Sequence, residues 1–488
     1  MIDYLKNRQS QRHKPYFRNV KVDLNDPIFK KIASIVQSNQ IPAYVVGGFV
    51  RDIFLNRPSK DIDVVVLGDG ISPAKQLAAQ TPHSNFAFFK NYGTAMVKTN
   101  DWEVEFVGAR KESYTHNSRK PAVEPGSLTD DQNRRDFTIN ALAISLNHDD
   151  FGTLVDPFGG MQDLEQKIIR TPLDADITFS DDPLRMMRGI RFATQLSFEI
   201  EHETFEAIKR NAPRIKIISF ERISDELNKI MLSQKPSIGF NLLFDSGLLQ
   251  IIFPEMAALY GVDVIDGKAH KDNFYHTLMV LDNICADTND LWLRWAALLH
   301  DIAKPVTKRF EKGTGWTFHG HEDKGSRMVK KIFGNLKLPL NEKMKFVEKI
   351  VALHHRPKVL AEEGVTDSAI RRLIVDAGED IDALFLLCKA DITSRHKVKV
   401  ETYRKKLEEV KQLVTDVTER DALRNWQPPV SGEDIMELFT IGPGKAVGIL
   451  KTEIREAILE GKVANNREAA LQYVIESALK LGLTPKEI

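Results

Sequence analysis

Two pairs of carboxylates alternate along stretches with the composition of β-strands. Asp61 and Asp63 begin one apolar run, and Glu103 and Glu105 alternate with apolar residues in another. Side chains two residues apart in a strand point to the same side, so each pair projects together. Neighbouring carboxylates repel unless cations neutralise them. Mg²⁺ is the natural candidate, because it prefers oxygen ligands and substrate phosphates.

A glycine pair precedes these carboxylates, where a predicted strand turns into a helix. Gly47 and Gly48 would let the backbone approach a ligand closely, and the first amides of the helix would face an anion, with Arg51 one turn further on. Taken alone, the pair is equally consistent with a tight turn. Combined with Asp61, Asp63 and a third carboxylate, it predicts a two-metal nucleotidyl-transfer site. One ion would lower the pKa of an attacking hydroxyl, and the other would hold a triphosphate and stabilise departing pyrophosphate.

A second group of charges is spaced by three residues along a predicted helix that starts at Pro183, with Asp182 as its N-cap. Asp182, Arg185, Arg188 and Arg191 then share one helix face. Three arginines on one face repel each other unless they bind anions, although a solvated basic face is the simpler alternative. Asp182 and Arg185 could pair with the edge of a base, and the other two arginines could reach triphosphate oxygens.

The elements that must position these groups change along the chain. Up to residue 172, short β-type runs alternate with helical stretches, whereas helical periodicity dominates afterwards. The predicted strands are Ala43–Val46, Ile62–Leu67, Thr94–Lys98, Val104–Val107 and Leu142–Leu146. We therefore expect an α+β fold, with a mixed sheet and helices in a head at 20–172. All-α regions follow, a neck at 173–262, a metal-binding domain at 270–400 and a tail at 401–488.

The motifs that carry these groups occur in a recognisable order. They are VVGGFVRD, DIDVVV, VEFVGARKE, RRDFTINALA, VDPFGG, DDPLRMMRGIRFA and ISFERISDEL. The sequence resembles the class II tRNA nucleotidyltransferases, the bacterial-type CCA-adding enzymes of the poly(A) polymerase/tRNA nucleotidyltransferase family. The resemblance implies template-independent addition of C, C and A to the 3′ end of tRNA. In that reaction the 3′-hydroxyl attacks the α-phosphate of CTP or ATP and pyrophosphate leaves.

The resemblance also implies a role for each catalytic and phosphate-binding motif. Asp61 and Asp63 would bind two Mg²⁺ ions, and Glu105 is the matching third carboxylate. The triphosphate-binding and ribose-contacting residues would be Gly47, Gly48, Arg51, Arg135 and Asp136.

Nucleotide selection is implied in the same way. Asp182 and Arg185 would form an amino-acid template that selects CTP and then ATP, while Arg188 and Arg191 complete the nucleotide pocket. Asp156 lies in the family's flexible hinge motif, which is thought to permit the switch from C to A. One departure is Asp181, where many relatives carry Glu. The neck and the tail would contact tRNA.

A cluster of histidines and carboxylates marks the third region. His276, the adjacent pair His300-Asp301 and the distant Asp391 resemble the pattern of the HD phosphohydrolase superfamily. Further ligands could come from His321 and His354, or from their neighbours His319 and His355. Imidazoles and carboxylates around a divalent transition metal would activate water. Some CCA-adding enzymes carry such a domain, and the resemblance implies a possible additional phosphatase or 2′,3′-cyclic phosphodiesterase activity. Mn²⁺, Fe²⁺, Ni²⁺ and Co²⁺ all suit such ligands, so the sequence does not name the metal.

Composition limits where such a protein works. The 68 Lys+Arg balance the 68 Asp+Glu, so RNA binding requires locally grouped positive charge, for example in residues 1–20, 209–216 or 395–406. No run of about 18 apolar residues occurs, which argues against a membrane protein. The polar N-terminus lacks the apolar core of a signal peptide, and there are only two cysteines. A cytoplasmic location is therefore expected.

Three alternatives remain open at this point. Bacterial poly(A) polymerases share the head motifs, and some relatives add only A and work beside a separate CC-adding enzyme. An alternative of another class makes the chain an HD phosphohydrolase whose head only binds RNA. The sequence does not indicate an oligomeric state.

Overall fold

The structure is a computed structural model that describes residues 20–89, 93–115, 118–363, 366–394, 396–421 and 427–486. Most of the basic N-terminal segment and Arg395, two features singled out above, lie outside the described residues. The chain divides into two compact units, one ending at Ala257 and the other starting at Ala258. Each unit is described by itself.

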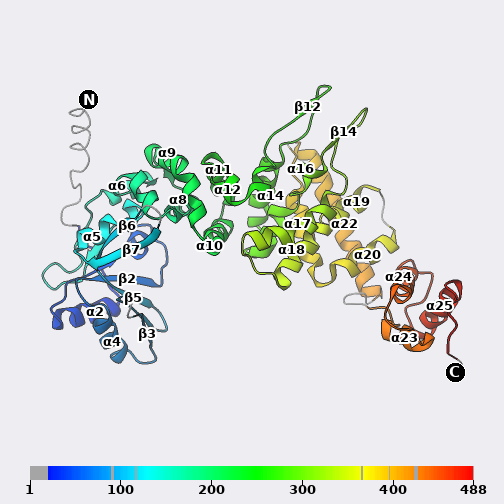
Figure 1. Ribbon diagram of the computed structural model, residues 1–488, viewed down its shortest axis with the longest axis horizontal. Helices are drawn as coiled ribbons and strands as arrows, with labels where there is room; N and C mark the ends of the chain where they lie inside the picture. Colours follow the sequence, from blue (N-terminus) through cyan, green and yellow to red (C-terminus); the bar gives the residue numbers. More distant parts are fainter. Residues whose placement is uncertain are drawn as a thin grey trace. The chain divides into compact units, whose positions relative to one another are not determined.

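A mixed seven-stranded sheet organises the first unit, as expected for the head (Figure 1). Its order is β3-β4-β5-β2-β1-β8-β9, and only the β2–β5 pair is parallel. The bounds are β1 Ala43–Val46, β2 Asp61–Val66, β3 Asn85–Phe89, β4 Thr94–Lys98, β5 Glu103–Gly108, β8 Ala143–Ser145 and β9 Leu154–Val155. A separate hairpin, β6 Arg110–Thr115 and β7 Ser118–Pro125, and the short pair β10 Ile168–Ile169 and β11 Glu199–Ile200 complete the strands of this unit.

The five predicted strands are confirmed to within two residues at each end, as β1, β2, β4, β5 and β8. They were recognisable because their apolar side chains are buried: Ile62, Val64, Val65 and Val66 of β2 are all at most 1% exposed. Strand β3 and the β6–β7 hairpin were not predicted. Strand β3 lacks the buried apolar side chains by which the other strands were recognised, because Phe88 and Phe89 are each 54% exposed.

Helices cover this sheet and then form the rest of the unit. Helix α4 packs against β3, β4 and β5, and α2 packs beside it. Asp26 caps α2 by accepting a hydrogen bond from Ile28 N at 2.9 Å, and Pro27 fits the first turn because its missing N–H has no helical partner there. The helices are α2 Pro27–Ser38, α3 Gly48–Phe54, α4 Ile71–Ala79, α5 Leu128–Asn133, α6 Gly160–Gln166, α7 Ala175–Asp181, α8 Leu184–Leu196, α9 His202–Asn211, α10 Phe220–Met231, α11 Pro236–Asp245, α12 Leu248–Ile252 and α13 Pro254–Ala257.

The second unit is helical apart from two short hairpins, β12 Val264–Ile265 with β13 Lys268–Ala269, and β14 Arg309–Glu311 with β15 Gly315–Thr317 (Figure 1). Helix α15 packs against α14 and α18, and α18 packs against α17. The helices are α14 Asn273–Cys285, α15 Leu291–Leu299, α16 Lys304–Thr307, α17 His321–Asn335, α18 Glu342–Leu353, α19 Arg356–Glu363, α20 Asp367–Ala377, α21 Ile381–Asp391, α22 Lys397–Asp421, α23 Gly432–Phe439, α24 Lys445–Leu459 and α25 Arg467–Lys480.

The last three helices have a hydrophobic core of their own, which includes Ile435 of α23, Leu450 of α24 and Val474 of α25, all 0% exposed. Two ion pairs join α24 to α20: Arg372 lies 2.8 Å from Glu456, and Arg455 lies 2.5 Å from Asp376. Across the residues that the structure describes, no helix combines the length and the apolar character needed to cross a membrane.

Candidate functional sites

One pocket of about 670 Å³ in the first unit collects the residues predicted for nucleotide transfer. Strands β2 and β5 supply carboxylates, and α3, α8 and the segment after α5 supply arginines. The predicted residues that line it are Gly47, Gly48, Arg51, Asp61, Asp63, Glu105, Arg135, Asp136, Asp182, Arg185, Arg188 and Arg191. The structure therefore brings together residues spread over about 145 positions of the sequence.

The carboxylates come from two neighbouring parallel strands. In the register of β2 and β5, Asp63 lies opposite Glu105. Burial and then the nearby carboxylates raise the pKa of both groups, although Arg135 partly offsets the increase at Asp63. Glu103, which the sequence left as an alternative to Glu105, forms an ion pair with Lys98 and does not line the pocket. Asp61, Asp63 and Glu105 thus form a set of oxygen donors whose mutual repulsion a divalent cation would relieve.

Gly47 is the N-cap of α3, and its backbone has a φ of 76°. A Cβ at this position would lie 2.9 Å from Arg135 Nη1 and 3.4 Å from Asp63 Oδ2. Both the left-handed backbone and the close approach therefore require glycine. Gly47 therefore serves both as the residue of a tight turn and as part of the pocket wall, the two interpretations that the sequence left open.

A chain of polar contacts links the arginines on opposite sides of the pocket. Arg51 donates from Nη1 to Asn140 Oδ1 at 2.8 Å, and Asn140 Nδ2 donates to Asp136 Oδ1 at 3.0 Å. Arg188 donates from Nε to Asp136 Oδ2 at 2.7 Å. Burial opposes ionisation of Asp136, but the Arg188 guanidinium and the Asn140 amide lower its pKa to about 2. Asp136, expected at the ribose, therefore also positions Arg188.

The helix-face arginines have countercharges inside the protein. Arg188 pairs with Asp136, and Arg191 Nε lies 2.6 Å from Glu226 Oε2 on α10. Together with Arg51, they also surround the ring of Phe192, at 4.0 to 5.3 Å from its centroid. Buried carboxylates and an aromatic face therefore stabilise Arg188 and Arg191 inside the protein, and binding of a nucleotide's phosphates stays a prediction.

Helix α8 begins at Leu184 with Pro183 as its N-cap, one residue later than predicted, and Asp182 still hydrogen-bonds to its first turn. Asp182 Oδ1 accepts a hydrogen bond from Leu184 N at 3.1 Å, and Oδ2 lies 3.7 Å from Arg222 Nη2 of α10. Arg185 is 9% exposed and donates to two backbone carbonyls, those of Thr178 and Arg134. Both side chains are thus held in fixed positions at the pocket wall, as a rigid template for a base would require.

Several residues of this site were missed by sequence reasoning. Asp131, which is fully buried, accepts from Arg134 Nε at 2.9 Å and from Arg135 Nε at 3.0 Å. Asn140 was hidden in the apolar stretch that follows the arginines, and its polarity there was the only signal. Arg222, Lys229 and Phe192 also line the pocket, and nothing in their spacing indicated this.

Asp156 lies away from this pocket lining. Its carboxylate accepts from Gly160 N at 2.8 Å and from Met161 N at 2.9 Å, so it caps α6. Its role as a hinge stays a prediction. In the basic cluster at 209–216, Lys209 pairs with Glu206 at 2.8 Å and Arg210 pairs with Asp176 at 2.7 Å. Acidic neighbours therefore partly neutralise that cluster.

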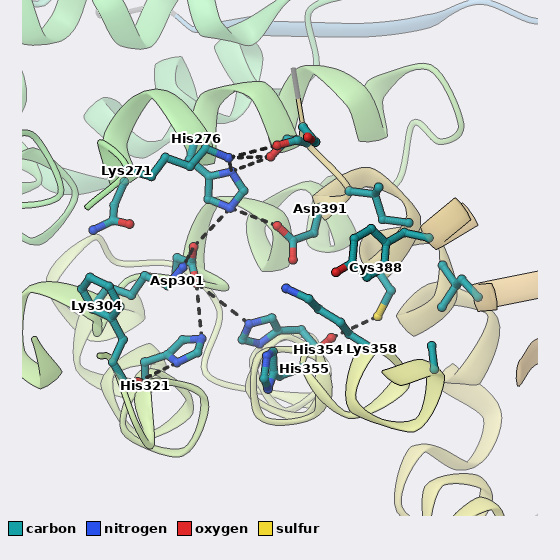
Figure 2. Close-up of a pocket in the computed structure, with 18 residues that line it drawn as sticks. Lys271, His276, Asp301, Lys304, His321, His354, His355, Lys358, Cys388 and Asp391 are labelled. Carbon is teal, nitrogen blue, oxygen red and sulfur yellow. Dashed lines mark hydrogen bonds and ion pairs between the residues drawn. The ribbon is translucent and has the colours of Figure 1, made fainter. Parts of the chain in front are cut away.

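A second site lies in the second unit and contains the predicted HD residues (Figure 2). Two groups of three residues have ligand atoms within 4.8 Å of one another: one is His276, His300 and Asp391, and the other is Asp301, His321 and His354. Helices α14, α17 and α21 carry His276, His321 and Asp391, and the remaining three residues directly follow α15 and α18. His319 is in neither group and its side chain is 84% exposed.

Hydrogen bonds orient three of these imidazoles. The Nδ1 atoms of His300, His321 and His354 lie 2.7, 2.9 and 2.7 Å from the carbonyl oxygens of Ala297, Phe318 and Val351. A carbonyl only accepts, so each Nδ1 carries a proton, which is the arrangement that directs Nε2 toward a metal in metal-binding histidines. Burial lowers the pKa of His300, but the neighbouring carboxylate of Asp301 raises it above the usual value. Burial and then His300 lower the pKa of His354 to about 3, which keeps this ligand neutral.

Positive charge beside the two carboxylates of this site stabilises their ionised forms. Burial opposes ionisation of Asp301 and Asp391, yet the neighbouring histidines hold both pKa values below the usual range. The pocket, of about 330 Å³, is also lined by Lys271, Lys304 and Lys358. Anionic ligands for metal next to ammonium groups suit a phosphate ester at a metal centre.

Comparisons with known proteins find similarity in both units of the chain. Sequence profiles match the poly(A) polymerase head domain at residues 43–170, the probable RNA and SrmB-binding site of polymerase A at 197–260, and the HD domain at 273–396. An A-adding tRNA nucleotidyltransferase of Deinococcus radiodurans is 31% identical over 437 residues, covering 88% of this chain and 94% of that protein. A multifunctional CCA protein of Shewanella frigidimarina is 34% identical over 308 residues, covering 61% of this chain and 70% of that protein.

Solved structures show the same likeness. A tRNA nucleotidyltransferase complexed with a primer tRNA and an incoming ATP analogue is 25% identical, with a TM-score of 0.57 over 78% of this chain and 99% of that one. The CCA-adding enzyme of Bacillus stearothermophilus in complex with CTP shares the fold, with a TM-score of 0.61 and 24% identity, covering 94% and 99% of the two chains.

Proposed function

The chain belongs to the poly(A) polymerase/tRNA nucleotidyltransferase family, and from this membership we propose that it adds C, C and A to the 3′ end of tRNA. It would use CTP and ATP, without a nucleic-acid template. The observation that carries the proposal is the single pocket in which three strand carboxylates face arginines from α3 and α8. That arrangement suits an anionic nucleotide whose phosphates lie against metal-binding oxygens.

Asp61, Asp63 and Glu105 are the residues that would hold divalent cations, which we propose to be two Mg²⁺. When bound, these ions supply activation of the attacking 3′-hydroxyl and charge neutralisation at the phosphates. The chain itself positions the nucleotide. Arg51, Arg188 and Arg191 present guanidinium groups around Phe192, where charge-assisted hydrogen bonds to phosphate oxygens are available.

Asp182 and Arg185 would select the base. Arg185 donates N–H groups to two backbone carbonyls, which fixes the plane of its guanidinium group. The guanidinium has further donors for the edge of the base. Asp182 keeps Oδ2 as an acceptor, because Oδ1 caps α8. A donor and an acceptor held rigidly side by side can distinguish C and A from U and G through their hydrogen-bonding edges.

Incubation with tRNA that lacks CCA tests this function. With CTP alone we expect two C to be added, and with both nucleotides C, C and A. Addition of A only to tRNA that already ends in CC would instead show an A-adding enzyme. This second candidate is favoured by the Deinococcus radiodurans relative, which is matched over 94% of its length. Long A tails would show a poly(A) polymerase.

We infer a second activity for the HD-type site, the hydrolysis of phosphate monoesters or 2′,3′-cyclic phosphates. The observation that supports this inference is the lysine-lined pocket with two groups of residues that could hold a metal ion. A divalent transition metal bound there would supply an activated water. The test is hydrolysis of 2′,3′-cyclic AMP and of p-nitrophenyl phosphate by protein reconstituted with Mn²⁺, Co²⁺ or Ni²⁺. No turnover with any of these metals would contradict this activity, without bearing on tRNA extension.

A further inference from the structure

We propose that Asp131 is a positioning residue of the nucleotide site, which aims the guanidinium group of Arg135 at the ribose of the incoming nucleotide. The preference for ribonucleotides over deoxyribonucleotides would then depend on a carboxylate that touches no part of the substrate. The inference rests on the nucleotide addition proposed above and names a residue that determines its specificity for the sugar.

The carboxylate of Asp131 holds one arginine at each oxygen. Asp131 lies on α5 and is 0% exposed, whereas Arg134 and Arg135 line the pocket. Oδ1 accepts a hydrogen bond from Arg134 Nε at 2.9 Å. Oδ2 accepts one from Arg135 Nε at 3.0 Å and lies 3.0 Å from Arg135 Nη2. Burial opposes ionisation of Asp131, but the two guanidinium groups lower its pKa, so the hydrogen bonds are charge-assisted.

These contacts fix the plane of the Arg135 guanidinium group. On its other side, Arg135 Nη1 donates to the carbonyl oxygen of Asn140 at 3.3 Å. Because an arginine has more N–H groups than these contacts use, Nη1 and Nη2 keep donors for a ligand. The Arg135 side chain is 17% exposed, so these donors are accessible from the pocket.

The position of Arg135 corresponds to the sugar of a bound nucleotide. At one end, a Cβ on Gly47 would lie 2.9 Å from Arg135 Nη1 and 3.4 Å from Asp63 Oδ2, so the guanidinium group lies beside the glycine turn and the strand carboxylates. At the other end, the carbonyl oxygen of Arg134 accepts from Arg185, which would read the base. The ribose joins the phosphates to the base and must lie between these two ends.

A role in stability alone predicts a different result. Helix α5 has a second buried anchor, because Gln132 is 1% exposed and its Nε2 donates to the carbonyl oxygen of Ala141 at 2.8 Å. If Asp131 only stabilised this region, its loss would weaken the binding of every nucleotide equally. If it aims Arg135, its loss removes a contact to the 2′-hydroxyl, which only a ribonucleotide has.

Binding of CTP and of 2′-deoxy-CTP to the full-length protein, measured by calorimetry without tRNA, tests this inference. We expect the unsubstituted protein to bind CTP about tenfold more tightly, the effect of one hydrogen bond that involves a charged group. Asp131→Ala should bring the ratio of the two Kd values to near unity, chiefly by weakening the binding of CTP. An unchanged ratio in this variant, or no preference in the unsubstituted protein, would overturn the proposal.

A double-mutant cycle shows whether Asp131 acts through Arg135. Arg135→Ala should lower the ratio as far as Asp131→Ala does, and the double variant Asp131→Ala/Arg135→Ala should lower it no further. A further loss in the double variant would overturn the assignment. Asp130→Asn is the matched control, because this neighbouring carboxylate on α5 accepts from Ser127 instead, and it should keep the ratio. A loss in the control would show that the ratio follows the fold of α5 and would also overturn the proposal.

Loss of the Asp131 carboxylate leaves two arginines without their countercharge, which can prevent folding. Thermal unfolding checks each variant. If Asp131→Ala does not fold, Asp131→Ala/Arg134→Ala decides the matter, because it removes one of these arginines as well. It should lose the preference for CTP, whereas Arg134→Ala alone should keep it, and the opposite result overturns the proposal.

The outcomes also separate this inference from the proposed function. A ratio that depends on Asp131, in a protein that adds no nucleotide to tRNA lacking CCA, would keep the positioning role and reject the proposed function. Addition of C, C and A with a ratio that does not depend on Asp131 would do the opposite.

Discussion

Asp136 and Arg188 form an ion pair in the wall of the nucleotide pocket, with Arg188 Nη2 2.7 Å from Asp136 Oδ2. Asp136 is 6% exposed, and Asn140 and the amide of Phe137 donate to its other oxygen. Both oxygens of the carboxylate are therefore occupied by protein donors, and a ligand could bind to them only if one of these hydrogen bonds were broken. Its main effect is to fix Arg188 beside Phe192, where the guanidinium can meet a nucleotide.

Replacement of Asp136 by asparagine should destabilise the protein in a pH-dependent way. The folded-state pKa of about 2 lies below the ordinary value of 3.8, so the pair stabilises the fold above about pH 4 and this contribution is lost as pH falls toward 2. We expect Asp136→Asn to lower the free energy of unfolding by about 2 kcal/mol at pH 7. The difference from the unsubstituted protein should shrink at pH 3, as measured by urea unfolding.

Asp176→Asn is the control for that measurement. Asp176 also pairs with an arginine, Arg210, but both side chains are about half exposed, so water screens the interaction. A loss at pH 7 as large as that of Asp136→Asn, or a loss for Asp136→Asn that does not change with pH, would contradict the assigned role.

Arg185→Ala should impair nucleotide choice more than tRNA binding. A fixed pair of hydrogen bonds to a base edge is worth about 1–3 kcal/mol of discrimination, so misincorporation of UTP should rise by about tenfold or more. Arg185→Lys keeps the charge but lacks the planar fork, and should also lose discrimination. The measurement compares kcat/KM for CTP, ATP and UTP with the Kd for tRNA. Unchanged choice with weakened tRNA binding would contradict the template role.

Much of this site was predictable, because its residues belong to short motifs. Asp61 and Asp63 alternate at the start of an apolar strand, and the arginines of α8 follow an Asp-Pro pair that is typical of a helix start. These local patterns were sufficient to predict the strand or helix that carries each side chain and the face on which it lies. The sheet could be outlined for the same reason, since its central strands are buried and read as apolar runs.

The remaining features depend on contacts between distant parts of the chain. Glu226 neutralises Arg191 from another helix, and no local pattern links the two residues. Sequence spacing also could not decide between Glu103 and Glu105, because that depends on the register with β2 and on Lys98, which pairs with Glu103. The two groups of candidate metal ligands in the HD-type site appear only when four histidines from different segments are brought together.

Gly47→Ala should weaken nucleotide binding and destabilise the head. Alanine at a φ of 76° costs about 1–2 kcal/mol, and its Cβ would also displace Arg135. Gly48→Ala is a matched control, because its Cβ would meet only Arg51 Nη2 at 3.6 Å. We expect the control to change the free energy of unfolding by less than about 0.5 kcal/mol. Equal effects of both substitutions on stability would contradict the conformational argument.

Asp61→Ala and His300→Ala should separate the two proposed activities. Asp61 belongs to the carboxylates of the head, and His300 belongs to the HD-type site, so each variant serves as the control for the other. We expect Asp61→Ala to abolish nucleotide addition to tRNA and to retain hydrolysis of 2′,3′-cyclic AMP, and His300→Ala to show the reverse. Assays of both reactions on each purified protein test this. Loss of both reactions in a folded variant would show that the sites do not act separately.

Lys271→Met should strengthen metal binding at the HD-type site. The Nδ1 atom of His276 lies 2.8 Å from Lys271 Nζ and 3.0 Å from Thr393 Oγ1, whereas the other three histidines face carbonyl oxygens. An ammonium group only donates, so it favours the His276 tautomer with the proton on Nε2, the atom that a metal must reach. Removal of Lys271 lets His276 direct Nδ1–H toward Thr393 and frees Nε2.

Titration of the Asp61→Ala/Asp63→Ala protein with Mn²⁺ by calorimetry measures this change. We expect Lys271→Met to lower the Kd for Mn²⁺ at this site by about tenfold, which corresponds to about 1.4 kcal/mol. Lys358→Met is the matched control, since Lys358 lines the same pocket and its loss removes the same charge. If both substitutions tighten binding equally, general electrostatics explain the effect, and the lysine does not act through the His276 tautomer.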